Sequence, residues 1–267
     1  GPIADDSNFA AITDSFKSMC MDKKLSIVML NVSDTLKVRL TDMGYTAIRC
    51  GSEPRFNLNK LKVRSEKSRA AQKQQIAVKY KVTINEYIYH ETPDSNLEQE
   101  MIALNDNWLD GRNPDKFTVY KRRQRDTLLP NILDFSHDTD RRYFYAVDEN
   151  GKIKGFLVFC PVADGSGYSC EAGRKAEDAS KNLMELIMHE AFEVLKSDGV
   201  GWAGMGLFPE EDIDIELNQR QNRWMTFVTR YYSDIFVCKN YKSASTKYHP
   251  ELWVDEHIVS LEYHDMY

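Results

Sequence analysis

The sequence predicts an α/β protein, and three observations lead to this class. Segments with the 3.6-residue apolar period of helices alternate with short apolar runs typical of buried strands. The dipeptide Asn150-Gly151 lies between two strand-like segments, which is a strong signal for a β-hairpin. The chain has 267 residues, 42% hydrophobic and 28% charged, as in soluble globular proteins. This length accommodates one large domain or two small ones.

Helix and strand signals alternate from the start of the chain. The apolar run at 26–30 predicts a buried strand after a helix at 8–21. Ser33 or Asp34 can cap the next helix, which ends at Gly44. The further elements expected before the hairpin are a strand at 46–50, a basic helix at 60–75, an extended segment at 76–90, and helices at 96–109 and 120–134.

The second half has a clearer pattern. The expected elements are strands at 143–147, 152–159 and 167–173, a helix at 180–197, a strand at 201–207, a helix at 211–235 and a strand at 257–263. A hairpin, a third strand, a helix and a further strand resemble the core order of a lobe of GNAT-type acyltransferases. We therefore expect a GNAT-like fold of tandem lobes, with an incomplete, abbreviated first lobe at 1–95 and a catalytic lobe at 96–267.

The loop between the third strand and its helix indicates which kind of acyl donor to expect. GNAT enzymes that use acyl-CoA bind its pyrophosphate there with a motif close to Arg-x-x-Gly-x-Gly/Ala, because glycines let backbone N–H groups approach the anion. In the frame that starts at Arg174, Glu177 stands where glycine is needed, and Asp178 follows. Two carboxylates would repel a pyrophosphate. The donor is therefore expected not to be a CoA thioester.

Basic residues gather in two places although the net charge is −6. Residues 60–81 hold eight lysines and arginines against one acid, Glu66, and a second cluster occupies 121–125. Either cluster is a solvated helix face or a surface that contacts a phosphate backbone.

Cysteine usage and hydropathy limit the cellular compartment and the metal sites that we expect. The five cysteines are scattered without a CxxC pair, which favours free thiols in a reducing compartment and argues against a zinc site. The six histidines show no metal-ligand spacing, so we expect no metal. No apolar run approaches 18 residues and no signal peptide is visible, so a cytoplasmic location is expected.

Motifs along nearly the whole chain resemble a known family. They are similar to the cytosolic domain of bacterial phosphatidylglycerol lysyltransferases, of the multiple peptide resistance factor type, and to fungal tRNA-dependent sterol aminoacyltransferases. The matching residues, in chain order, are Gly1-Pro2-Ile3, Gly44-Tyr45, Gly51-Ser52-Glu53, Asn57-Leu58, Arg69 with Lys73, Trp108-Leu109, Phe117-Thr118-Val119, Glu171 with Arg174, Asp178-Ala179, Met205-Gly206 with Pro209, and Lys247-Tyr248 with Pro250.

The resemblance implies transfer of an amino acid from aminoacyl-tRNA, as co-substrate and without another cofactor, to a hydroxyl or amine acceptor such as a lipid. A lipid acceptor implies peripheral contact with a membrane. The residues expected to bind tRNA are Arg64, Lys67, Arg69, Lys73, Arg122 and Arg123.

The chemistry of the transfer assigns roles to the remaining candidates. Carbonyl attack requires positioning, deprotonation of the nucleophile and stabilisation of an oxyanion. Glu171 or Glu185 suits the substrate ammonium, and Arg174 or Lys247 suits the terminal phosphate or the oxyanion. Gly206 would let substrate approach the backbone where two strands splay. The further substrate-binding candidates are Asp178, Glu211, Asp212 and Trp108.

Each candidate also has a purely structural interpretation. Glu171 could simply pair with Arg174, Glu185 could be solvated, and Gly206 could serve a β-bulge. The acidic run 210–216 could complement a helix dipole. Three other functions stay open: dipeptide or cyclodipeptide formation from aminoacyl-tRNA, acyl-CoA N-acetylation, and tRNA binding without catalysis.

Overall fold

The computed structural model describes residues 5–60, 66–89, 93–110, 133, 135, 140–162, 165, 167–209 and 250–262. The helices predicted at 120–134 and 211–235 lie outside these residues. Candidates that also lie outside them are Arg64, Arg122, Arg123, Glu211, Asp212 and Lys247. Lys67, Arg69 and Lys73 lie on a described helix, but their side chains are not described.

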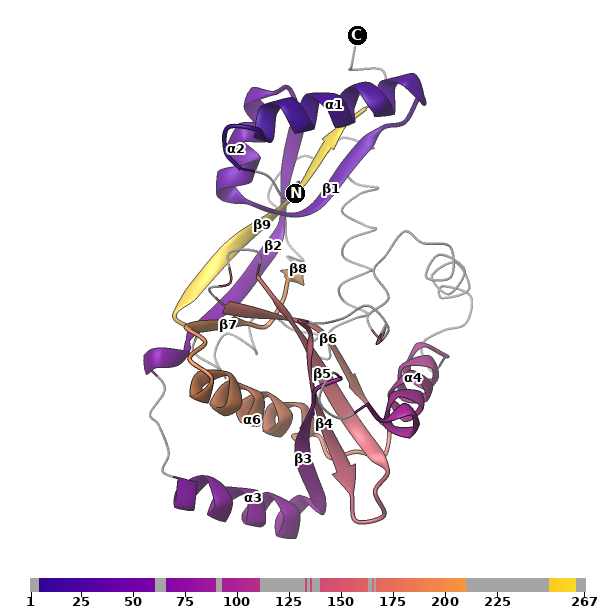
Figure 1. The fold of residues 1–267 in the computed structure, drawn as a ribbon, viewed down its shortest axis with the longest axis vertical. Helices are drawn as coiled ribbons and strands as arrows, with labels where there is room; N and C mark the ends of the chain where they lie inside the picture. Colours follow the sequence, from indigo (N-terminus) through magenta and orange to yellow (C-terminus); the bar gives the residue numbers. More distant parts are fainter. Residues whose placement is uncertain are drawn as a thin grey trace. The chain divides into compact units, whose positions relative to one another are not determined.

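The chain forms two compact units. One contains residues 1–55 and 207–267, and the other contains residues 56–206. The first unit is thus built from both ends of the chain, around an unbroken central segment that makes the second (Figure 1). The predicted division into lobes at residue 95 stays a prediction.

The first unit is a small antiparallel sheet with two helices. Strand β9 lies between β1 and β2, and β8 pairs with β2. The elements are α1 (Phe9–Asp22), β1 (Ile27–Ser33), α2 (Asp34–Asp42), β2 (Thr46–Asn57), β8 (Phe208–Pro209) and β9 (Leu252–Leu261). The buried core of this unit is Phe9, Cys20, Ile27, Val32, Leu40, Tyr45, Val259 and Leu261. The predicted helices and first strand are confirmed.

Strand β2 is longer than predicted, because it continues through a glycine that the sequence does not mark as strand. Gly51 pairs with both β8 and β9. A Cβ atom at Gly51 would lie 2.1 Å from the carbonyl oxygen of Phe208. Only glycine therefore permits β8 to approach β2 this closely.

The second unit is a five-stranded sheet with helices on both faces. Its order is β7-β6-β5-β4-β3, in which only β6 and β7 are parallel. Helix α6 covers one face and α4 the other (Figure 1). The elements are a 3-10 helix (Leu58–Lys60), α3 (Glu66–Tyr80), β3 (Val82–Tyr87), α4 (Ser95–Asp110), β4 (Arg142–Asp148), β5 (Ile153–Pro161), β6 (Gly167–Lys175), α6 (Leu183–Ser197) and β7 (Trp202–Gly204).

The hairpin β4–β5, the third strand β6, the helix α6 and the parallel strand β7 occur in the predicted order. The α/β, GNAT-like class is therefore confirmed. The extended segment predicted at 76–90 is wrong in its first part, because α3 continues to Tyr80. Lys81, with φ of +55°, ends that helix in the left-handed conformation, and only then does β3 begin.

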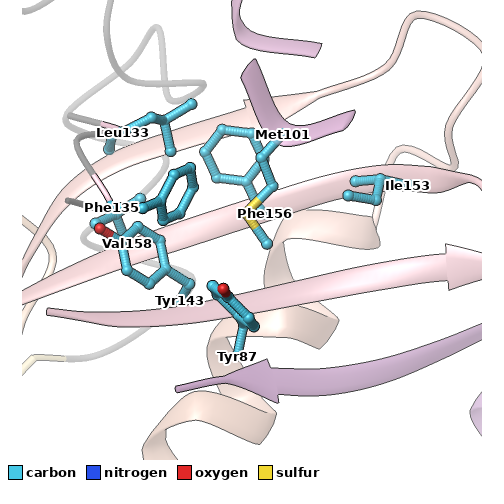
Figure 2. Packing of buried hydrophobic residues seen from close by; sticks show 9 residues of the cluster. Tyr87, Met101, Leu133, Phe135, Tyr143, Ile153, Phe156 and Val158 are labelled. Atoms are coloured by element: carbon cyan, nitrogen blue, oxygen red, sulfur yellow. The ribbon is translucent and has the colours of Figure 1, made fainter. Parts of the chain in front are cut away.

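Aromatic and aliphatic side chains fill the space between α4 and the sheet (Figure 2). Met101 of α4 is fully buried against Phe156 and Val158 of β5 and Tyr143 of β4. This packing fixes α4 over the strands, and it thereby sets the position of the last turns of α4 against β6.

A buried carboxyl in the first unit predicts a pH-dependent stability. Burial raises the pKa of Glu256 to about 7, and the neighbouring Glu53 adds to the shift. Because an unfolded glutamate titrates near pH 4.3, the folded state binds an extra proton between these values, and stability falls as pH rises from about 4.5 to 7.

We expect the free energy of unfolding of the E256Q variant, relative to wild type, to rise by about 2 to 3 kcal/mol between pH 5 and pH 8. Urea denaturation at both pH values measures this difference, in which the titration of all other groups cancels. A difference that does not change with pH would contradict the assignment to Glu256.

Candidate functional site

The second unit has an open strand edge at the point where β6 and β7 diverge. The parallel pairing covers only Gly167–Ser169 of β6 and Trp202–Gly204 of β7. Strand β6 continues to Lys175 with β5 on its other side. Within the described part of the chain, no strand pairs with the second edge of β6 beyond Ser169. We call residues 170–175 the open edge of β6, and its backbone groups can bind an extended substrate.

Glu171 is the extra residue of a β-bulge in this segment of β6, where it pairs with β5. Val158 of β5 pairs with Ala172, and Phe159 pairs with Cys170, so Glu171 has no partner in the ladder. A bulge redirects the side chain and interrupts pairing, and bulges are over-represented next to active sites. The Glu171 side chain is 32% exposed. It is therefore available to a substrate at the divergence of the two strands.

Two groups hold the Glu171 carboxylate, one from the neighbouring strand β5 and one from the residue just before β4. The thiol of Cys160 donates to Oε2 over 2.8 Å, and Nε of Arg141 lies 3.3 Å from the same oxygen. Burial, together with the Glu171 charge, raises the pKa of Cys160 to about 12. The thiol is thus protonated at neutral pH and is a hydrogen-bond donor, not a nucleophile. A carboxylate accepts about four hydrogen bonds, so a substrate ammonium can bind Glu171 beside these partners.

Arg174 lies further along β6, on the face of the sheet that α4 covers, where it pairs with Phe156 of β5. Its side chain is fully buried. Nε donates to Oδ1 of Asn105 over 2.8 Å, Nη1 donates to the carbonyl of Gly173 over 3.0 Å, and the guanidinium lies 4.2 Å from the centre of the Trp108 ring. The ion pair of Glu171 is thus with Arg141, not with Arg174. Direct contact of Arg174 with a phosphate or oxyanion stays a prediction, and the contacts described here position α4 on β6.

The loop between β6 and α6 uses its own backbone donors. The amide of Ala179 donates to Ala176 O over 3.2 Å, and the amide of Leu183 donates to Ser180 O over 3.1 Å. The amide of Asn182 lies 3.4 Å from the Ser180 hydroxyl. These N–H groups are therefore not directed at a bound anion, as they are in a pyrophosphate loop.

The two carboxylates of this loop, Asp178 and Glu177, differ in their contacts. Asp178 pairs with Lys154 over 2.6 Å, and this hydrogen bond lowers the Asp178 pKa. Lys154 also lies 3.6 Å from Asp148. Glu177 is exposed. A diphosphate would have to displace Asp178 from Lys154 and approach Glu177, and both are unfavourable.

A cavity of about 230 Å³ lies beside this loop. Charged groups of both signs line it, among them Lys81, Asp148, Lys154 and Asp178, together with Tyr80. Glu185, in the first turn of α6, is half-buried and is not part of the lining. The structure thus brings Asp178 to a polar cavity but does not bring Glu185 or Trp108 there.

Gly206 follows β7, where the chain has left the pairing with β6. Its φ of +79° is in the left-handed region, which glycine adopts without strain. This conformation explains the glycine without a substrate. The approach of substrate to this backbone stays a prediction.

Three residues of the site were not expected from the sequence: Arg141, Cys160 and Asn105. Each becomes recognisable only through a partner distant in the chain. Arg141 and Cys160 contact Glu171. Asn105 of α4 contacts Arg174 of β6. Within the described residues, no cluster of His, Cys, Asp or Glu side chains could hold a metal ion. No described helix is long and apolar enough to cross a membrane.

The Arg174 contacts predict a specific loss of stability. We expect Asn105→Ala to lower the free energy of unfolding by about 1.5 to 3 kcal/mol, because it removes an acceptor from a buried charged donor. Asn107→Ala changes the same residue type on the exposed side of the same helix, and we expect a change within about 0.5 kcal/mol. Urea denaturation compares the two, and equal effects would show that the hydrogen bond to Arg174 is not what stabilises α4.

Three solved structures are similar to this chain along most of its length. L-PGS from Bacillus licheniformis is 16% identical and superimposes with a TM-score of 0.70, over 95% of this chain and 74% of the other. The C-terminal domain of a putative lysylphosphatidylglycerol synthetase from Agrobacterium fabrum is 15% identical, with a TM-score of 0.66 over 96% and 74% of the two chains. A conserved protein of unknown function from Bacteroides thetaiotaomicron is 16% identical, with a TM-score of 0.55 over 94% and 75%.

No curated protein matches the sequence. The family model described as "Phosphatidylglycerol lysyltransferase, C-terminal" matches residues 1–259. The chain therefore belongs to the phosphatidylglycerol lysyltransferase C-terminal family.

Proposed function

We propose that the chain is an aminoacyltransferase that moves an amino acid from aminoacyl-tRNA to a hydroxyl or amine acceptor. The first candidate for the acceptor is a lipid hydroxyl such as that of phosphatidylglycerol. The observation that carries the proposal is the bulged Glu171 on the open edge of β6, where a carboxylate and strand backbone groups meet. Family membership supports an acyltransferase that acts on a lipid.

The proposed reaction is a direct displacement at the aminoacyl ester. The acceptor oxygen forms a bond to the ester carbon, and the bond from that carbon to the ribose oxygen breaks. The acceptor proton ends on the ribose hydroxyl. Glu171 holds the α-ammonium group of the amino acid, and the backbone of the open edge faces the carbonyl. Because the Cys160 thiol is protonated, it is not an activated nucleophile. The proposed reaction therefore forms no acyl-enzyme on this residue.

An aminoacyl-tRNA donor agrees with the loop before α6 better than a CoA thioester does. Several amides of this loop donate to acceptors within the loop, and Lys154 is occupied by Asp178. N-acetylation from acetyl-CoA is therefore the weaker alternative. The acidic run at 210–216, which would suit an amine acceptor in dipeptide or cyclodipeptide formation, lies outside the described residues.

Helix α3 is the proposed contact for the tRNA backbone. It carries Lys67, Arg69 and Lys73, and Arg64 precedes it. Basic side chains that contact successive phosphates give sequence-independent binding that weakens with salt. Retention of this binding without transfer would identify a non-catalytic tRNA-binding module.

We expect the E171Q variant to transfer labelled amino acid from charged tRNA at least about 100-fold more slowly than wild type, because it loses the charge that binds the ammonium. The assay supplies tRNAs charged with different amino acids, and as acceptors phosphatidylglycerol, a sterol and small amines. Wild type should discriminate against N-acetylated aminoacyl-tRNA, and E171Q should not. A purely structural role of Glu171 would leave this discrimination unchanged.

The control for this experiment is E177Q, which removes an exposed carboxylate from the adjacent loop and should transfer at the wild-type rate. Acetyl-CoA is supplied as a competing donor. Acetyl transfer, or no release of any amino acid above spontaneous hydrolysis, would overturn the proposed function.

Charge reversal on α3 tests the tRNA contact. We expect R69E/K73E to weaken tRNA binding and to make the slope of log K against log salt shallower by roughly 0.7 to 0.9 for each lost phosphate contact. The control K23E/K24E makes the same change in net charge at the end of α1 in the other unit. Equal effects of both variants on affinity and slope would attribute binding to net charge and remove α3 from the contact surface.

A further inference from the structure

Helix α1 carries a row of exposed apolar side chains. Ile12, Phe16 and Met19 are 41%, 43% and 45% exposed. Their spacing of i, i+4 and i+7 aligns them along one side of the helix. Leu25, just after the helix, is 50% exposed. We call these four residues the α1 row.

The α1 row is not needed for the core of the first unit. The helix packs inward through Phe9, Thr13 and Cys20, which are 4%, 2% and 5% exposed. The apolar side of α1 is therefore wider than the part that its own unit covers. Large exposed side chains that align along one helix are typical of an interaction surface, whereas scattered ones are normal.

The charges at the Leu25 end of the α1 row suit an anionic partner. Lys23 continues the row at i+11, and Lys24 separates it from Leu25, so two exposed ammonium groups lie at the end that carries Leu25. Asp14 lies about half a turn around the helix from the row, and Asp22 lies to one side of it. Apolar side chains next to lysines are the pattern of helices that bind anionic lipid surfaces.

We infer that the α1 row inserts between the headgroups of an anionic phospholipid bilayer, with Lys23 and Lys24 at the lipid phosphates. This inference rests on the proposed function, because a lipid acceptor must be reached at a membrane surface. The row extends over about 10 Å of helix, since seven residues rise 1.5 Å each. That is small for a stable protein interface, which buries about 800 Å² on each partner, but sufficient for reversible interfacial binding.

The test measures binding to vesicles without tRNA. Wild type should sediment with vesicles of phosphatidylcholine and phosphatidylglycerol, more weakly with phosphatidylcholine alone, and less at high salt. We expect I12S/F16S/M19S to reduce partitioning roughly tenfold or more. The control V78S/L252S removes two side chains that are 77% and 57% exposed elsewhere, and should bind as wild type does. Equal binding by the triple variant and wild type would overturn the inference.

Three further measurements keep the test decisive. If the triple variant does not fold, F16W reports insertion directly: its fluorescence should shift to the blue with anionic vesicles, and an unchanged spectrum would overturn the inference.

Aminoacyl transfer is then measured on vesicles and on lipid dissolved in detergent. Loss of transfer by the triple variant on vesicles only supports the α1 row, and equal transfer on vesicles contradicts it. If wild type transfers no amino acid on vesicles or in detergent, the proposed function is overturned. The vesicle-binding measurement then still decides whether the α1 row binds membranes. Sedimentation velocity tests self-association. If wild type dimerises through the row and the triple variant binds vesicles as wild type does, the row serves self-association and the inference is overturned.

Discussion

The short pairing between β6 and β7 is the constraint on which the second unit depends for its site. Two parallel strands share only three residue pairs, after which β6 continues alone along β5. Longer pairing would close the edge with backbone hydrogen bonds and leave no place for a substrate. The bulge at Glu171 falls on the part of β6 that β7 does not cover. The divergence and the bulge therefore act on the same backbone segment.

Two charged side chains of β6 have separate roles in the candidate site. Near the divergence from β7, Cys160 and Arg141 hold the Glu171 carboxylate, which keeps partial exposure. Further along the strand, a fully buried Arg174 links β6 to Asn105 and Trp108 of α4. A buried guanidinium is costly unless its donors are satisfied, so these contacts also restrict where α4 can lie. Support for the open edge thus comes from a charge that does not itself reach the surface.

Much of the architecture follows from local patterns in the sequence. The Asn150-Gly151 turn predicts the β4–β5 hairpin, and the apolar stripe of α6 predicts its packing, since both depend on residues close in the chain. The end of α3 was misplaced because Ile76 and Val78 favour strands, whereas the left-handed Lys81 is what ends the helix. The choice of Glu171 as a candidate could be made from a motif, but its bulge could not be predicted, because strand register depends on how β5 and β6 pair. The partners Asn105 and Cys160 are hidden for the same reason.

The protonated thiol beside Glu171 has a chemical consequence. Burial and the Glu171 charge raise the pKa of Cys160 to about 12, so the thiol is protonated at neutral pH. Because peroxides and alkylating agents react with the thiolate, we expect this sulfur to react slowly although it lies next to the proposed reaction centre. A carboxylate that keeps its neighbouring thiol protonated in this way makes the proposed reaction independent of the redox state of this cysteine.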